Sequence, residues 1–196
     1  QFMTKTFKCV AISDTHNTLD RVAIPPCDFL FHAGDGTNMG KEWEVVNWLD
    51  EFANTPAKHK VIIVGNHDFL AEQDGPKFKA MCDRREIVYL KDNAVELEGV
   101  KIYGAPWQPW FYDWAFNLDR GEDIAERWAL IPAGLDVLIT HGPPEGILDV
   151  PGGVGRGHVG CKDLLDRILE VKPRYHIFGH IHGSYGEKIF EGTHFV

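Results

Sequence analysis

Apolar runs alternate with amphipathic runs along most of the chain. Short, mainly apolar runs predict strands over residues 7–12, 29–31, 61–64, 136–139 and 175–178. Apolar residues with a helical spacing predict helices over residues 42–52, 76–84, 121–130 and 161–171. Two further short strands, at 94–97 and 100–103, flank Glu98-Gly99, which is typical of a tight hairpin turn.

Strands that alternate with helices, together with one hairpin, predict an α/β domain with layered, mixed sheets. A length of 196 residues suits one domain, which we expect over residues 3–196 with Met3 as the native start. Near the end, residues 184–190 are predicted to form another strand. Residues 193–196 resemble the beginning of one more, so we expect that the sequence stops early.

Composition and charge narrow the class of protein. Hydrophobic residues make up 44% and charged residues 25%, which is ordinary for a soluble globular protein. No apolar run approaches the roughly 18 residues of a membrane helix, and no signal peptide is visible. The four cysteines are widely spaced without a CxxC pair, which favours reduced thiols in a cytoplasmic protein over a structural zinc site. A net charge of −9 makes nucleic acid an unlikely partner.

Potential metal ligands follow five of the predicted strands, close to the point where each strand ends. They are Asp14 and His16, Asp35, Asn66 and His67, His141, and His180 and His182. Because ligands of α/β sheets gather outside the carboxyl ends of the strands, these side chains could meet although they span most of the sequence.

The residue types indicate what such a meeting point would bind. Aspartate and histidine suit manganese, iron, zinc, nickel or cobalt, and one carboxylate can bridge two metals. Taken singly, each histidine could be an ordinary buried or surface residue, and Asn66-His67 could be turn chemistry. Taken together, the ligands suffice for two divalent cations side by side, an arrangement that hydrolyses phosphate esters.

The order of these motifs resembles that of the calcineurin-like metallophosphoesterases. That family's pattern is D-x-H, G-D, G-N-H-[DE], a histidine and G-H-x-H, and all five blocks occur between residues 14 and 182. The resemblance implies a four-layer α/β/β/α sandwich and two divalent metal ions, with manganese favoured. It implies one metal held by Asp14, His16, Asp35 and His182, and a second held by Asp35, Asn66, His141 and His180.

The same resemblance implies roles for two catalytic residues. With two metals bound, a bridging hydroxide is expected to attack the phosphorus, and His67 is expected to act as general acid or to stabilise the transition state. Asp68 is expected to orient the imidazole of His67, as a carboxylate partner does. Asn66 and His67 are also candidate substrate ligands, together with Arg156 and His158 from the glycine-rich stretch at 142–160.

A finer resemblance points to a branch of the family. Three segments are similar to the branch that includes the vertebrate brain protein 239 phosphodiesterases and bacterial relatives: residues 105–110, 114–117 and 141–144. This likeness implies phosphodiester substrates, including 2′,3′-cyclic nucleotides. The aromatic residues of the region either pack the fold or form a wall that stacks a nucleobase; they are Trp107, Trp110, Phe111, Tyr112 and Trp114.

Four other functions remain open at this point. A phosphomonoesterase, such as a protein phosphatase, would use the same metal centre with a different pocket. A DNA nuclease is disfavoured by the net charge of −9. A non-catalytic scaffold, or a simple metal-binding or storage protein, would not need His67 beside the ligands.

Overall fold

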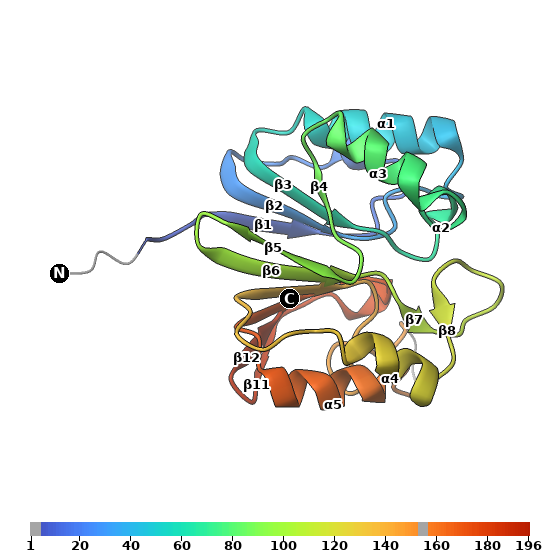
Figure 1. The fold of residues 1–196 in the computed structure, drawn as a ribbon, viewed down its shortest axis with the longest axis vertical. Helices are drawn as coiled ribbons and strands as arrows, with labels where there is room; N and C mark the ends of the chain where they lie inside the picture. Colours follow the sequence, from blue (N-terminus) through green and yellow to red (C-terminus); the bar gives the residue numbers. More distant parts are fainter. Residues whose placement is uncertain (1–4, 153–156) are drawn as a thin grey trace.

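Four layers of secondary structure make up the protein in its computed structural model, which describes residues 5–152 and 157–196 (Figure 1). Two sheets pack face to face in the middle, and helices cover the outer face of each sheet. This arrangement confirms the predicted α/β/β/α sandwich with mixed sheets.

The first sheet contains only parallel strands and comes from the N-terminal half of the chain. Its order is β1 (Cys9–Ile12), β2 (Cys27–Ala33), β3 (Ala57–Ile63) and β4 (Val88–Tyr89). The connecting helices are α1 (Glu42–Ala53), α2 (Phe69–Gln73) and α3 (Gly75–Asp83). Side chains alternate along β2, so that Phe29 and Phe31 lie between the sheets while Leu30 packs on the helical side.

The second sheet is mixed and comes from the C-terminal half. It comprises β5 (Asn93–Leu97), β6 (Val100–Ala105), β9 (Val137–Thr140), β10 (Tyr175–Ile177), β11 (Lys188–Phe190) and β12 (Thr193–Phe195), in the order β11-β12-β10-β9-β6-β5. The edge strands β5 and β11 run antiparallel to their neighbours. Helices α4 (Glu122–Trp128) and α5 (Lys162–Val171) cover its outer face (Figure 1).

Short elements complete the fold. A two-stranded ribbon, β7 (Gln108–Pro109) and β8 (Asn117–Leu118), projects beside the strand ends, and 3-10 turns form at Leu19–Arg21 and His182–Ser184. None of the helices within residues 5–152 and 157–196 has the length and apolar character needed to cross a membrane.

Most of the predicted elements are present, and one is wrong in part. The hairpin turn falls at Glu98 and Gly99, with φ of 52° and 84°. The strand predicted over residues 184–190 is extended only at Lys188–Phe190. Its beginning is held in a different conformation because the Ser184 hydroxyl donates to the Val150 carbonyl at 2.5 Å. Helix α2, with five residues, is too short to show a helical period and was not predicted.

Candidate metal centre

All seven predicted metal ligands lie together just beyond the carboxyl ends of five parallel strands. Three groups of ligand atoms each fit within 4.8 Å: Asp14 with His16 and His182, Asp35 with His16 and His67, and Asp35 with His141 and His180. The seventh residue, Asn66, joins the last group, because its Oδ1 lies 2.9 Å from the Nε2 of His141. Residues that are up to 168 positions apart in sequence are therefore neighbours in space.

The carboxylate of Asp35 is central to this cluster. Its Oδ2 faces the Nε2 atoms of three rings, at 3.2 Å from His141, 3.9 Å from His16 and 4.0 Å from His67. Its Oδ1 accepts a hydrogen bond from the backbone amide of His67 at 2.8 Å. One buried oxygen thus faces ring nitrogens from both halves of the chain.

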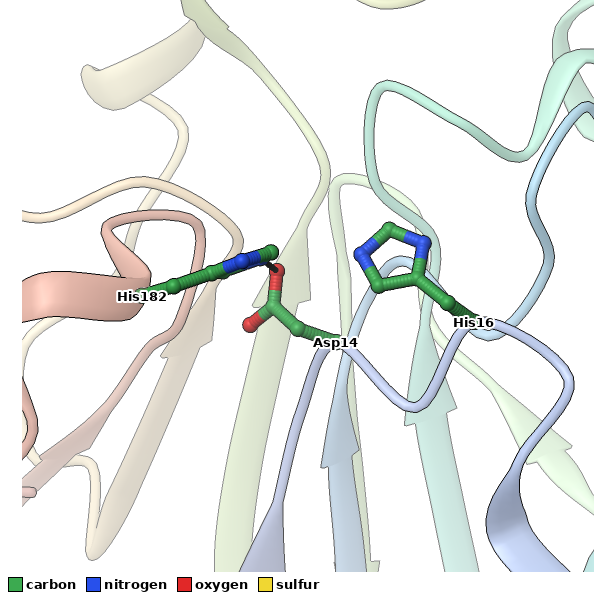
Figure 2. A group of neighbouring side chains, drawn as sticks. All are labelled: Asp14, His16 and His182. Atoms are coloured by element: carbon green, nitrogen blue, oxygen red, sulfur yellow. Dashed lines mark hydrogen bonds and ion pairs between the residues drawn. The ribbon is translucent and has the colours of Figure 1, made fainter.

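Asp14 organises the more open side of the cluster. Figure 2 shows its carboxylate between the rings of His182 and His16. The Nε2 of His182 lies 3.1 Å from Oδ1 of Asp14, and the backbone amide of His180 donates to Oδ2 at 3.0 Å. The loop after β10 is therefore tied to the loop after β1 through a single side chain.

Backbone carbonyls fix the orientation of two histidine rings. The Nδ1 of His141 lies 2.9 Å from the carbonyl oxygen of Ala33, and the Nδ1 of His16 lies 3.1 Å from that of Thr37. Since a carbonyl oxygen only accepts, each Nδ1 carries a hydrogen and each Nε2 of the neutral ring keeps its lone pair. Within the described residues the buried Nε2 of His16 has no hydrogen-bond partner. A cation coordinated by this lone pair would satisfy it.

The electrostatics of the cluster also favour a cation. Burial alone would raise the pKa values of Asp14 and Asp35, but neighbouring histidines hold both below the ordinary carboxyl range. Burial opposes a charge on His141, yet the adjacent Asp35 carboxylate raises the pKa of His141 to about 9. Two buried carboxylates remain ionised here by sharing positive partners, and a divalent ion can take over that role.

The backbone of the cluster is strained. Four of the ligand candidates have positive φ, namely Asp14 (52°), His16 (42°), Asp35 (56°) and His180 (70°). A non-glycine residue in this region costs on the order of 1–3 kcal/mol and is typical of functional sites. Hydrogen bonds between the loops stabilise these strained conformations. One of them runs from the Asp14 amide to the Gly34 carbonyl at 2.9 Å.

The structure does not form the predicted contact between Asp68 and the ring of His67. Both oxygens of the buried Asp68 carboxylate accept from other groups: the amides of Gly65 (2.8 Å), Asp35 (2.9 Å) and Thr37 (3.0 Å), and the Thr37 hydroxyl (2.7 Å). Among the described residues, the hydrogen-bond partner of the His67 ring is instead the Asn38 carbonyl, 2.6 Å from Nδ1. Asp68 therefore ties the loop after β2 to the loop after β3, and burial raises its pKa to about 6.

Only one of the two substrate-binding candidates of the glycine-rich stretch, His158, lies in the described part of the chain. The exposed ring of His158 bonds the buried carboxylate of Asp149, with Nδ1 2.5 Å from Oδ1. Arg156 lies outside the described residues.

Two groups that contact His67 gave no clear signal in the sequence. The indole of Trp114 lies against its imidazole, with ring centroids 4.1 Å apart, although the aromatic cluster suggested only a general wall. The other group is the carbonyl of Asn38, and a backbone atom has no sequence signature.

Comparisons with known proteins agree with this geometry. The sequence profile of the calcineurin-like phosphoesterase family matches residues 7–184. Metallophosphoesterase domain-containing protein 1 of Homo sapiens and that of Mus musculus are each 42% identical over 200 residues, which cover 90% of this chain. The aligned region spans 61% of the length of each of these relatives.

Solved structures show the same fold at low sequence identity. TT1561 of Thermus thermophilus superposes with a TM-score of 0.64 at 12% identity, covering 97% of this chain and 88% of that one. Phosphopantetheinyl hydrolase from Mycobacterium tuberculosis gives a TM-score of 0.64 at 15% identity, covering 96% and 87%. The fold is the metallophosphoesterase fold. The chain belongs to the calcineurin-like phosphoesterase family.

Proposed function

We propose that this protein is a dinuclear-metal phosphoesterase that hydrolyses phosphodiesters, including 2′,3′-cyclic nucleotides. The observation that carries the proposal is the position of Asp35, whose Oδ2 faces the Nε2 atoms of His141 and His16, which belong to two different ligand groups. A carboxylate so placed can bridge two cations.

The grouping of the ligand atoms supports the division between two cations that the family resemblance implies. One cation would be held by Asp14, His16, Asp35 and His182, and the other by Asp35, Asn66, His141 and His180. Manganese is the favoured ion, and this mixture of oxygen and nitrogen ligands also suits iron, zinc, nickel and cobalt. When bound, a pair of divalent cations supplies acidified water and offsets negative charge on phosphate oxygens.

His67 is the proposed proton donor to the leaving oxygen. Its Nδ1 donates to the Asn38 carbonyl, so its Nε2 is the atom that remains available to a substrate. That Nε2 lies 4.0 Å from Asp35 Oδ2, which puts it at the edge of the proposed bridge. Asn66 lies beside the centre and is a further candidate substrate ligand, whereas the roles proposed for His158 and Arg156 rest on sequence alone.

An aromatic shelf beside the centre supports a preference for diesters with an aromatic or nucleoside group. The shelf consists of Phe111 and Tyr112, which contact each other at the tip of the β7–β8 ribbon and are 49% and 74% exposed. The ring of Phe111 lies 6.3 Å from that of His180. An aromatic ester group that extends from the phosphate toward this shelf can stack on an exposed ring.

Activity measurements after metal loading test the proposal. The metal-loaded protein is assayed with bis-p-nitrophenyl phosphate, p-nitrophenyl phosphate and 2′,3′-cyclic AMP. We expect turnover of both diesters to exceed that of the monoester. A preference for the monoester would instead support a phosphomonoesterase, and no turnover by protein that carries two ions per chain would contradict any hydrolytic role.

The variant His67→Ala tests the proton donor. Loss of general acid catalysis lowers rates by about 10²–10⁴-fold, so kcat should fall by that order while two ions stay bound. The matched control is His59→Ala, because His59 bonds Glu98 on a distant surface at 2.7 Å and should leave turnover unchanged. Equal activity of His67→Ala and the unaltered protein would refute the role of His67.

A further inference from the structure

The imidazole of His67 is held on two sides by groups to which the reaction assigns no role. On its edge, Nδ1 lies 2.6 Å from the Asn38 carbonyl oxygen. On its face, the Trp114 indole lies with ring centroids 4.1 Å apart and an angle of 33° between the planes. An imidazole in this position can neither flip nor tilt without moving one of these two groups.

The carbonyl of Asn38 is itself held firmly by its neighbour Thr37. The Thr37 amide and hydroxyl donate to Asp68 Oδ1 at 3.0 Å and 2.7 Å, and the same hydroxyl accepts from the Gly40 amide at 3.0 Å. Thr37 is completely buried. Asp68 therefore acts on His67 indirectly: it holds Thr37 in place, and the neighbouring Asn38 carbonyl contacts the His67 ring.

The indole of Trp114 is anchored in a similar way. The amide of the next residue, Ala115, donates to the Asn66 carbonyl at 3.1 Å, and the amide of Phe116 donates to the Glu72 carboxylate at 2.7 Å. The segment that carries the indole is thus tied to the loop that carries His67.

These contacts determine which ring nitrogen is available. The carbonyl requires a hydrogen on Nδ1, so the neutral ring keeps its lone pair on Nε2, the atom that faces Asp35. Protonation then places the new hydrogen on Nε2, where the proposed function needs it.

We propose that Trp114 and the Thr37–Asn38 turn are positioning residues that set the tautomer and the orientation of His67. The carbonyl and the indole together do what a carboxylate partner does for other catalytic histidines. This inference rests on the proposed role of His67 as proton donor.

Substitution of Trp114 gives the first test. Small displacements at a reacting centre cost up to about 10²-fold, so we expect Trp114→Leu to lower kcat by roughly 10-fold or more, with KM and the two bound ions unchanged. Trp114→Phe keeps an aromatic face and should recover most of that loss. Trp43→Leu is the matched control, since Trp43 is an exposed residue of α1.

A double-mutant cycle separates positioning from a general structural effect. If Trp114 acts through His67, Trp114→Leu should cause no further loss of kcat in the His67→Ala background. The same fold-loss in both backgrounds would overturn the inference. No effect of His67→Ala on kcat would instead overturn the proposed role of His67 as proton donor.

Thr37 offers an independent variant and a direct readout. Thr37→Val removes the hydroxyl but keeps the shape, whereas Thr37→Ser keeps the hydroxyl and should behave as the unaltered protein. ¹⁵N NMR of zinc-loaded protein reports the tautomer of His67. We expect the Nδ1–H form in the unaltered protein and in Thr37→Ser, and a mixture in Thr37→Val and Trp114→Leu. An Nε2–H tautomer in the unaltered protein would contradict the assignment.

Discussion

At the scale of single residues, the centre depends on how closely its loops approach one another. Gly65 precedes Asn66, and a Cβ placed there would lie 2.3 Å from Oδ1 of Asp35 and 2.6 Å from Cε1 of His141. Neither partner can retreat, because both are buried and hydrogen-bonded. Only glycine therefore fits at position 65.

The variant Gly65→Ala should accordingly lose metal. The added methyl group pushes the carboxylate and the imidazole apart, and overpacking of this kind also costs about 1–3 kcal/mol of stability. Elemental analysis of purified protein is the measurement. Gly142→Ala is the control, since the nearest atom to its Cβ would be 3.8 Å away, and it should keep both ions. Retention of two ions by Gly65→Ala would show that the loops are looser than the structure implies.

The identities of the ligand candidates could be predicted from sequence because each is a polar side chain at a strand end, in motifs of recognisable order. The partners that orient them could not be predicted in the same way. His141 and His67 are oriented by the carbonyls of Ala33 and Asn38, and any residue type supplies a carbonyl. Asp68 was expected at His67, but three backbone amides from two loops donate to its oxygens instead.

At the scale of elements, the long connection between β9 and α5 is closed by one carboxylate. Oδ2 of the buried Asp149 accepts from the amides of Gly146 at 2.9 Å and Gly160 at 3.0 Å, and Oδ1 accepts from His158. The guanidinium of Arg120 donates to the carbonyls of Gly160 and Val159, each at 2.7 Å. The glycine-rich stretch thus carries its own anchor, Asp149, and is held from outside by Arg120, although its described part contains no helix or strand.

This anchor predicts a pH-dependent contribution to stability. Burial alone would raise the pKa of Asp149, but the bonds from His158 and the two amides bring it below the ordinary carboxyl value. A carboxyl whose pKa is lower in the folded state than in the unfolded state stabilises the fold at pH values above its unfolded pKa. This stabilisation is lost as the pH falls through the folded-state pKa.

Urea unfolding of Asp149→Asn at several pH values measures this contribution. At pH 7 the variant should be less stable by about 1–3 kcal/mol, because buried amides lose a charged acceptor. Below pH 4 the difference should shrink, since the unaltered carboxyl becomes protonated. Asp113→Asn, at an exposed position, is the control and should show no such difference. A deficit that stays constant down to pH 3 would exclude the carboxylate as its cause.

Elements with a clear period could be predicted from the sequence, and those without one could not. Helix α5 presents Leu164 and Ile168 to the core at a helical spacing. The ribbon strands β7 and β8 have two residues each, which is too short for a pattern. Yet the segment between β7 and β8 places the Trp114 indole against the His67 ring.

At the scale of the whole molecule, the candidate metal centre lies at the strand ends of the two sheets and takes residues from both. Asp14, His16 and Asp35 follow strands of the first sheet, whereas His141, His180 and His182 follow strands of the second. Cations held between these sets would link the two halves of the sandwich. The four layers themselves followed from the family resemblance, because periodicity along the chain does not show how sheets stack.

Removal of metal should therefore lower the stability of the entire fold. An ion that binds only the folded state, present at a concentration 100 times its Kd, adds about 2.7 kcal/mol to the free energy of unfolding. We expect a chelator to lower the melting temperature and added manganese to restore it. Asp35→Asn should lose this response, because the proposed bridge is gone. Thermal unfolding with and without manganese is the measurement, and an identical melting temperature in both conditions would contradict a structural link through metal.

An anomalous difference map from a crystal soaked with manganese shows directly whether Asp35 bridges two cations. We expect two peaks about 3.5–4 Å apart with the Asp35 carboxylate between them. One peak should lie beside Asp14, His16 and His182, and the other beside Asn66, His141 and His180. A single peak, or two peaks that do not share Asp35, would contradict this bridging role.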